Sequence, residues 1–188
     1  MVLRIKKTKI YREASKNKRS LYKKRLRKIS KRRRIYIDES GIHEHVYQTH
    51  GWSKKGVRIV ERVSGQRFKR TNLIAGYCKN QPLAQKIFDG SCTADFFEEW
   101  FSSEFLPAIP TDGVIIMDNA RFHRKKQLSI LLEKFNFQQK ADVQLLFLPP
   151  YSPDLNPIEH YWAHVKNKVR KEKGNYDDFI ECLKFCFV

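Results

Sequence analysis

Two short apolar runs in this chain each end in an aspartate. Ile35-Tyr36-Ile37 precedes Asp38, and the run 113–117 (GVIIM) precedes Asp118. Each run is short, rich in β-branched residues and bounded by polar or turn-forming residues, which is typical of a buried strand. We therefore expect both aspartates at strand ends, where an open α/β sheet usually presents its ligands.

Between these runs the pattern predicts a hairpin and then a helix. Residues 70–78 and 82–88 have strand character, and the connection 79–81 (KNQ) is typical of a hairpin. Thr93 is placed to cap a helix whose aromatic residues recur at helical spacing. We expect this aromatic face to belong to the core; it consists of Phe96, Phe97, Trp100 and Phe101. A helix from about Lys125 to Phe135 and a strand at 144–148 are predicted next.

The segment 145–162 (LLFLPPYSPDLNPIEHYW) combines a strand pattern, a rigid turn and the start of a helix. Its four prolines fix the backbone, because each restricts φ and lacks an amide donor; they are Pro149, Pro150, Pro153 and Pro157. Asn156 is suited to cap the helix, and Pro157 is suited to its first turn. Glu159 follows within this first helical turn. The rigid proline-rich segment before the helix would therefore fix the direction of one carboxylate.

Asp38, Asp118 and Glu159 thus come from two strands and a helix. Carboxylates from separate elements are the ligands that Mg²⁺ prefers, with positions left for water and phosphate. Two such ions, roughly 3.5–4 Å apart, can cleave a phosphodiester, because they activate the attacking oxygen and stabilise the leaving oxygen. The pattern therefore predicts a metal-dependent site acting on a phosphodiester.

The motifs resemble the catalytic domain of the DDE transposases of the mariner superfamily, most closely the bacterial insertion-sequence branch. The resemblance covers about residues 35–175. The segments that carry it are YIDESG (36–41), GWSKKG (51–56), FDGSCTADFFEEWFSSEFLP (88–107), MDNARFH (117–123) and LPPYSPDLNPIEHYW (148–162).

This resemblance implies an α/β, ribonuclease H-like fold: a mixed five-stranded sheet flanked by helices. It also implies that Asp38, Asp118 and Glu159 form the catalytic, metal-binding triad, with two Mg²⁺ ions for which Mn²⁺ can substitute. Asn119 is expected to support Asp118 through amide hydrogen bonds. His123 is expected either to contact phosphate or the third carboxylate, or to make a structural hydrogen bond.

Three other acidic or histidine residues are set aside. Glu39 adjoins Asp38 but points to the opposite face of a strand, because side chains alternate there. His160 and His164 stand four residues apart on one helix, a spacing compatible with zinc, but no third ligand is evident.

One departure from the family concerns spacing. Forty residues lie between Asp118 and Glu159, more than the family commonly has. We place the surplus in 133–144 (EKFNFQQKADVQ), and expect a surface connection, which tolerates extra residues at little entropic cost.

Positive charge is concentrated at the start of the chain. Of 38 Lys and Arg residues, 17 lie in 1–34, which has one acid, Glu13; the remainder nets only +2. We divide the chain into a basic helical arm (1–34) and a catalytic domain (35–188). An apolar stripe in the arm predicts a helix; it includes Leu21, Tyr22, Leu26 and Ile29. The arm suits sequence-independent contact with DNA phosphates, although a solvated tail is the alternative. The residues expected to contact DNA are Lys23, Lys24, Arg25, Arg27, Lys28, Lys31, Arg32, Arg33 and Arg34.

The expected function is DNA strand cleavage and strand transfer during transposition, on transposon ends and target DNA, by a homodimer. Full-length relatives carry a helix-turn-helix region that reads the terminal repeats, and the chain starts in what resembles the linker after it. We therefore expect a separately encoded recognition domain or a truncated copy. The alternatives are a DNA-binding remnant inactive in transposition, and a host nuclease acting on RNA–DNA hybrids.

Location and redox state follow from composition. No apolar run is long enough to span a membrane, so we expect a cytoplasmic, nucleoid-associated protein. The four cysteines show no CxxC spacing, and Cys182 and Cys186 are expected to be buried, reduced thiols.

Overall fold

The structure, a computed structural model, describes residues 11–44, 53–60 and 69–187. The first ten residues of the arm and part of the GWSKKG motif lie outside these ranges. Within them a five-stranded sheet has the order β3-β2-β1-β4-β5. Its strands are β1 (Arg34–His43), β2 (Arg70–Cys78), β3 (Gln81–Phe88), β4 (Val114–Met117) and β5 (Gln144–Phe147). β1 pairs antiparallel with β2 and parallel with β4, which confirms the predicted mixed sheet.

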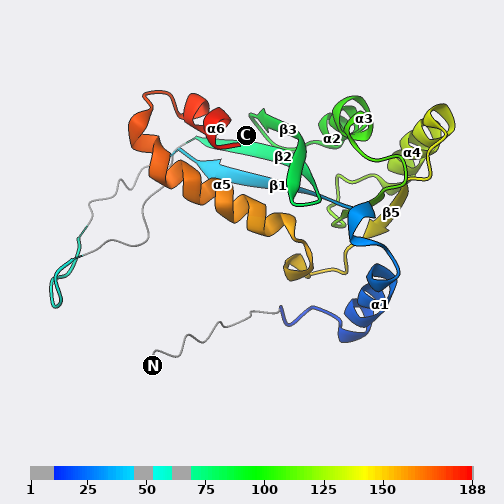
Figure 1. Cartoon of the computed structure of the whole chain (residues 1–188), viewed down its shortest axis with the longest axis horizontal. Helices are drawn as coiled ribbons and strands as arrows, with labels where there is room; N and C mark the ends of the chain where they lie inside the picture. The colour runs from blue at the N-terminus through cyan, green and yellow to red at the C-terminus, as the bar shows by residue number, and fades with distance from the viewer. Residues whose placement is uncertain (1–10, 45–52, 61–68, 188) are drawn as a thin grey trace.

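Helices cover both faces of the sheet, and strand alternation decides which side chains meet them (Figure 1). Ile35 and Ile37 of β1 pack into one core, whereas Tyr36 and Ile42 pack into the other. The Ile35 face carries α2 (Ala94–Trp100), the π-helical turn η2 (Phe101–Phe105), α3 (Leu106–Ala108) and α4 (Lys125–Gln139). The Tyr36 face carries α1 (Lys16–Arg27), α5 (Ile158–Glu172) and α6 (Phe179–Phe187). Single 3₁₀ turns are η1 (Lys31–Arg33), η3 (Pro153–Leu155) and η4 (Lys173–Asn175).

Several local predictions are confirmed. β2 spans the predicted residues 70–78, and the turn to β3 has Lys79 and Asn80 at positive φ, as a tight hairpin requires. Thr93 Oγ1 accepts a hydrogen bond from the amide of Phe96 at 3.2 Å and caps α2. The aromatic face is core, because Phe97, Trp100 and Phe101 are fully buried.

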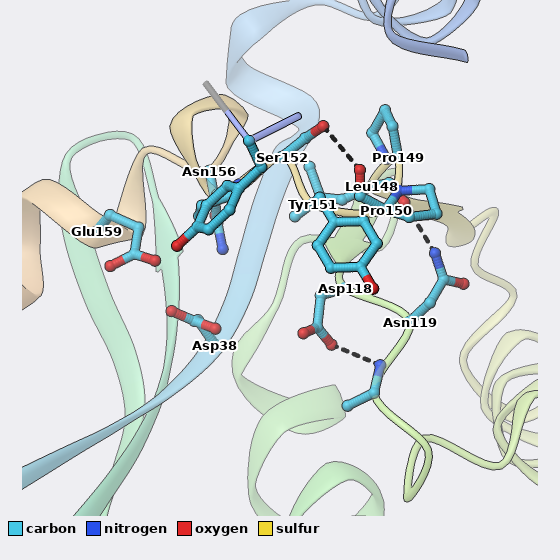
Figure 2. A pocket seen from close by; sticks show the side chains of 13 residues that line it. Asp38, Asp118, Asn119, Leu148, Pro149, Pro150, Tyr151, Ser152, Asn156 and Glu159 are labelled. Atoms are coloured by element: carbon cyan, nitrogen blue, oxygen red, sulfur yellow. Dashed lines mark hydrogen bonds between the residues drawn. The ribbon is translucent and has the colours of Figure 1, made fainter. Parts of the chain in front are cut away.

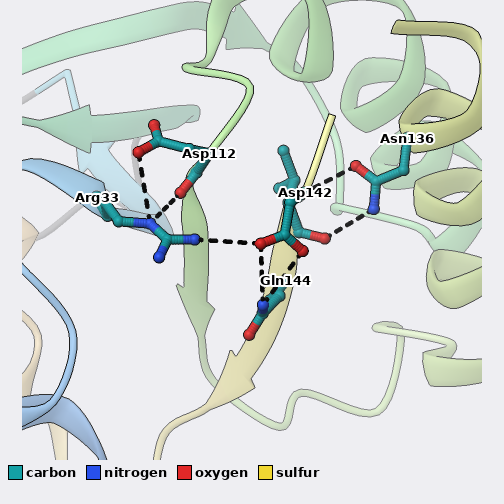
Figure 3. A network of polar contacts seen from close by, with 6 residues as sticks. Arg33, Asp112, Asn136, Asp142 and Gln144 are labelled. Carbon is teal, nitrogen blue, oxygen red and sulfur yellow. Dashed lines mark hydrogen bonds and ion pairs between the residues drawn. The ribbon is translucent and has the colours of Figure 1, made fainter. Parts of the chain in front are cut away.

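Most of the surplus segment 133–144 is exposed, as expected, but much of it is helix and not a connection. α4 continues to Gln139 instead of ending near Phe135, and Lys140 closes it in the left-handed region (φ 50°). The Asn136 amide then donates to the carbonyl of Val143 at 2.9 Å and accepts from its amide at 3.0 Å (Figure 3). The extra residues therefore form ordered structure that leads directly into β5.

The basic arm is docked on the sheet through α1. Tyr22 is buried in the core to which residues of α5 and α6 also belong, and Leu26 and Ile29 pack partly against that core. The predicted apolar stripe is wrong for Leu21, which is largely exposed. The division of the chain at residue 34 stays a prediction.

Two arginines expected to contact DNA are instead engaged within the protein. Arg34 donates to the carbonyls of Leu26 at 2.8 Å and Ile29 at 2.7 Å, tying the end of α1 to β1. Arg33 donates to the carbonyl of Asp112 and lies 3.6 Å from the Asp142 carboxylate (Figure 3). These bonds engage both guanidinium groups within the protein, and contact of Arg33 and Arg34 with DNA stays a prediction.

No helix in the described residues is long and apolar enough to cross a membrane. Cys182 and Cys186 are buried free thiols, as predicted.

Candidate active site

The parallel pairing of β1 and β4 brings the two aspartates together. Tyr36 pairs with Ile116, and Asp38 and Asp118 each stand two residues further along the chain. Tyr36 and Ile116 both face the core under α5, so a two-residue step directs both aspartates to that same face. The neighbouring strand ends thus present two carboxylates beside the start of α5.

The proline-rich turn positions Glu159 at the beginning of α5. Ser152 Oγ donates to the carbonyl of Pro150 at 3.1 Å, and the carbonyl of Ser152 accepts from the Leu155 amide. Pro157 has helical angles (φ −61°, ψ −22°), and its carbonyl accepts the first helical bond, from His160. Glu159 is exposed in the first turn, as predicted.

Asn156 does not cap α5, which corrects the sequence-based prediction. Its backbone is extended (φ −106°, ψ 103°), but its side-chain oxygen is buried and has no hydrogen-bond partner. The amide group faces the cleft described next instead of the first turn of the helix.

The carboxylates border a single cleft of about 640 Å³ (Figure 2). Asp38 lies at its floor, with Glu159 and Asp118 on either side. The other lining residues come mainly from the proline-rich turn; they include Leu148, Pro149, Pro150, Tyr151, Ser152, Pro153 and Asn156, with Tyr11 from the arm. Among the described residues, no group of three or more Asp, Glu, His or Cys side chains is arranged closely enough to hold a metal ion.

The surroundings of Asp38 disfavour the ionised form of its carboxylate. Burial and the nearby carboxylates of Glu39, Glu159 and Asp118 together raise its pKa to about 8. The indole N–H of Trp162, on α5, donates to Asp38 Oδ2 at 3.0 Å and partly offsets this effect. A buried tryptophan needs such a partner, so Trp162 is both core and positioning residue.

Asp118 has the opposite environment. Burial alone would raise its pKa, but hydrogen bonds from His123 and from the Ala120 amide outweigh burial and lower it. His123 Nδ1 lies 3.1 Å from Asp118 Oδ1, and the Ala120 amide donates to the same oxygen at 2.9 Å. The carboxylate is thereby kept ionised and fixed in orientation, although its side chain is 52% exposed.

His123 bridges Asp118 and Glu39, which is the structural role that was one of the two expected of it. Its side chain is 2% exposed, and its Nε2 lies 3.4 Å from Glu39 Oε1. Burial would lower the imidazole pKa, but the hydrogen bonds to Asp118 and Glu39 raise it to about 9. Glu39 points away from the cleft as predicted, and supports Asp118 through His123.

Asn119 supports the cleft differently from the prediction. Its amide donates to the carbonyl of Leu148 at 2.8 Å, and no hydrogen bond joins it to Asp118 among the described contacts. It therefore ties the end of β4 to the start of the proline-rich turn.

An ion pair between the arm and the proline-rich turn was missed by the sequence reasoning. Arg19 makes two hydrogen bonds to the Asp154 carboxylate, at 2.8 and 2.6 Å. Tyr11 also approaches Tyr151, with ring centroids 6.3 Å apart. The only signal was that Arg19 lies on the same side of the helix as Tyr22, at a spacing of three.

The other residues expected to contact DNA are exposed on α1 or in the turn after it: Lys23, Lys24, Arg25, Arg27, Lys28, Lys31 and Arg32. Lys23, Lys24 and Arg27 border one shallow groove on α1, together with Lys16, Arg19 and Ser20. This arrangement leaves cationic side chains available to an anionic partner.

The carboxylate donors that line the cleft are of the chemical type that a hard divalent cation takes. Three carboxylate side chains face one space, and their mutual repulsion contributes to the raised pKa of Asp38. A cation there would relieve this repulsion, and oxygen donors are what Mg²⁺ and Mn²⁺ take.

Comparison with known proteins agrees with this architecture. The family of DDE superfamily endonucleases matches residues 33–182, so the chain belongs to that family. It is 32% identical over 130 residues to the uncharacterized protein y4pE/y4sA of Sinorhizobium fredii, covering 65% of this chain and 76% of that protein. It is 40% identical over 57 residues to the transposable element Tcb2 transposase of Caenorhabditis briggsae, covering 30% and 19% respectively.

Solved structures give the same fold. The Mos1 transposase paired-end complex with the left transposon end superimposes with a TM-score of 0.66 at 16% identity, over 98% of this chain and 57% of that one. The catalytic domain of the Mos1 mariner transposase gives 0.57 at 16% identity, over 95% and 81%. The predicted ribonuclease H-like fold is thereby confirmed, and the family match confirms the predicted DDE relationship. The chain spans just over half the length of the first of these structures, and its place in the insertion-sequence branch stays a prediction.

Proposed function

We propose that this chain is the catalytic domain of a DNA transposase, which cleaves and rejoins DNA strands with the help of divalent metal ions. The observation that carries the proposal is the cleft: three carboxylates from β1, the end of β4 and the start of α5 border it, in a member of the DDE superfamily endonucleases. The similarity to Tcb2 and Mos1 transposases supports DNA transposition as the reaction.

Asp38, Asp118 and Glu159 are the residues that would hold the metal, which we propose to be two Mg²⁺ ions with Mn²⁺ as a substitute. The mariner Mos1 paired-end complex has been solved with Mg and with Mn, which supports this choice of ions. When bound, such ions would acidify a water molecule and offset negative charge on a phosphodiester.

The protein's own groups prepare the carboxylates for this task. Trp162 holds Asp38, and the pair His123–Glu39 holds Asp118, so each side chain reaches the cleft in one orientation. The turn Pro149–Pro157 gives Glu159 a rigid base. Water would attack a phosphodiester and leave a 3′-hydroxyl; that hydroxyl would then attack a target phosphodiester and displace another 3′-oxygen.

The proposed partners are transposon ends and target DNA. The cationic residues of α1 and its following turn support phosphate contact, because they are exposed and lie in the segment docked beside the cleft. We also propose that two copies act together on paired ends, by analogy with the paired-end complex of Mos1. A separately encoded recognition domain and association with the bacterial nucleoid stay predictions.

A nicking assay tests the function. Supercoiled plasmid and end-labelled duplexes would be incubated with Mg²⁺, Mn²⁺ or EDTA, using the wild type, Asp118→Ala and a control, Asp177→Ala. Asp177 is exposed and far from the cleft-lining set. We expect metal-dependent nicking by the wild type and the control, and none by Asp118→Ala.

DNA binding without nicking in either metal would contradict the proposal and favour a DNA-binding remnant. If the protein cleaves an RNA–DNA hybrid in preference to duplex DNA, the transposase proposal is contradicted and a host nuclease is favoured.

A further inference from the structure

An exposed aromatic residue stands in the carboxylate cleft. Tyr151 lies in the proline-rich turn, lines the cleft together with the three carboxylates, and is 58% exposed. Figure 2 shows its ring on the same side of the cleft as Asp118. A single exposed aromatic elsewhere on a protein surface needs no explanation. This ring, however, would lie beside a phosphodiester bound to the carboxylates, and the proposed reaction gives it no role.

The backbone holds Tyr151 in a conformation that bulky residues rarely adopt. Its φ is 55°, in the left-handed region that favours glycine. The turn around it is locked, because Ser152 Oγ donates to the carbonyl of Pro150 at 3.1 Å and the carbonyl of Ser152 accepts from the Leu155 amide. Ser152 is buried, whereas Tyr151 beside it projects outward. Strained residues of this kind cluster at binding sites, so the conformation of Tyr151 points to a ligand.

A second aromatic residue lines the same cleft. The ring centroid of Tyr11, in the arm, lies 6.3 Å from that of Tyr151, with the two ring planes at 45°. The rings therefore meet at an angle and are not stacked face to face. Since Tyr151 stays 58% exposed despite this contact, it keeps an open surface for a ligand.

The lining of the cleft indicates which part of DNA this surface would contact. No Lys or Arg among the described residues lines the cleft. Its lining near Tyr151 is instead largely apolar, with Leu148, Pro149, Pro150 and Pro153. Such a lining suits the flat face of a nucleobase better than a phosphate. Aromatic side chains stack on bases with little dependence on sequence, because every base has a π-face.

We propose that Tyr151 stacks on a nucleobase next to the phosphodiester that the carboxylates hold, and so fixes the position of the strand in the cleft. This inference rests on the proposed function, since it takes DNA as the ligand. The contact requires one face of the base to be free. A strand end or an unpaired stretch therefore suits Tyr151 better than an intact duplex.

Two single strands of equal length test this contact. One carries all its bases, and in the other tetrahydrofuran abasic residues replace the central bases. Binding would be followed by fluorescence anisotropy in Ca²⁺, which takes oxygen ligands, with the integrity of the strands checked on a gel. We expect Tyr151→Ala to bind the strand with bases about tenfold more weakly than the wild type, and the abasic strand equally well. Tyr151→Phe keeps the ring and should bind both strands as the wild type does.

Two further variants separate stacking from a structural role. Phe137→Ala is the matched control, because Phe137 is an 88% exposed aromatic on α4 that does not line the cleft. It should bind both strands like the wild type. Tyr151→Gly relieves the strained backbone, because glycine adopts a positive φ without steric cost. It should therefore lose affinity as Tyr151→Ala does, without a fall in melting temperature.

The outcomes distinguish this inference from the function it rests on. Equal binding of the strand with bases by Tyr151→Ala and the wild type would overturn the stacking contact, and so would an equal loss for both strands. A matching loss in Tyr151→Phe would also overturn it, and would point to the hydroxyl group. If the base-dependent loss appears but the wild type nicks no DNA in Mg²⁺ or Mn²⁺, the stacking contact holds and the proposed cleavage fails.

Discussion

Asp38 and Asp118 end neighbouring parallel strands and face the same cleft, yet their surroundings act in opposite directions. Asp38 is buried among other carboxylates, with one donor, the indole of Trp162, and its pKa is raised to about 8. Asp118 is half-exposed and receives bonds from His123 and the Ala120 amide, and its pKa is lowered. The protein thus keeps the Asp118 carboxylate ionised, whereas the charged form of Asp38 is disfavoured; in the proposed function a bound cation would stabilise it.

The largest expected effect is on the rate of cleavage. Although their surroundings differ, both Asp38 and Asp118 should be needed for it. Asp38→Asn and Asp118→Asn should each slow Mg²⁺-dependent nicking by at least about a thousandfold, on the order of 4 kcal/mol. Glu159→Gln should behave in the same way, and rates on supercoiled plasmid measure all three. Near wild-type cleavage in any of them would remove that residue from the proposed triad.

The support of Asp118 should show the next largest effect. His123→Ala breaks the bridge to Asp118 and leaves the carboxylate of Glu39 without its partner. We expect a 10- to 100-fold loss of activity, roughly what removing a residue behind a metal ligand costs. His164→Ala, an exposed histidine on α5, is the control and should retain full activity.

If His123→Ala and His164→Ala cleave equally fast, the orientation of Asp118 does not depend on His123. A fall in melting temperature without a fall in activity would assign His123 to stability alone.

Stability in EDTA should distinguish the two aspartates directly. The folded-state pKa of Asp38, about 8, lies above its ordinary value of 3.8, so the folded protein binds this proton more tightly than the unfolded chain. The contribution of Asp38 to stability therefore falls as pH rises from about 4 to 8. Asp38→Asn should raise the melting temperature at pH 8 by about 3 °C, corresponding to roughly 1 kcal/mol, and by less at pH 5.

Asp118→Asn should lower the melting temperature under the same conditions, because the carboxylate accepts bonds that the amide accepts less well. Calorimetry at the two pH values measures both variants. A lower melting temperature for Asp38→Asn at pH 8 would contradict the unfavourable environment of Asp38.

The smallest expected effect is on stability and concerns a third aspartate, Asp154. Its hydrogen bonds with Arg19 lower its pKa, so the stability that this pair contributes is present near neutral pH and is lost as pH falls through the lowered pKa. Arg19→Ala should destabilise the protein by about 1–2 kcal/mol near pH 7. Exposed Lys18→Ala should not, as followed by urea unfolding. Equal stability of the two variants would mean that the pair does not anchor α1.

The sequence predicts the elements of the site well, since each rests on a local signal. The apolar runs before Asp38 and Asp118 form β1 and β4, and the prolines before Glu159 form the predicted turn. Contacts between distant residues have no such signal. His123 and Glu39 are 84 positions apart, and Arg19 and Asp154 are 135 apart, so only the folded chain brings them together.

Two local predictions failed because tertiary structure overrode propensity. Asn156 has the chemistry of a cap, but the turn directs its side chain into the cleft. The polar segment after residue 133 resembled a loop, but Asn136 and Val143 close it onto β5 and extend α4.

Anomalous diffraction from crystals soaked in Mn²⁺ tests the central claim most directly. The account predicts anomalous density in the cleft, bordered by the carboxylates of Asp38, Asp118 and Glu159. Density only elsewhere on the protein, in crystals whose Mn²⁺ binding is saturated in solution, would contradict the assignment of these three residues as the metal site.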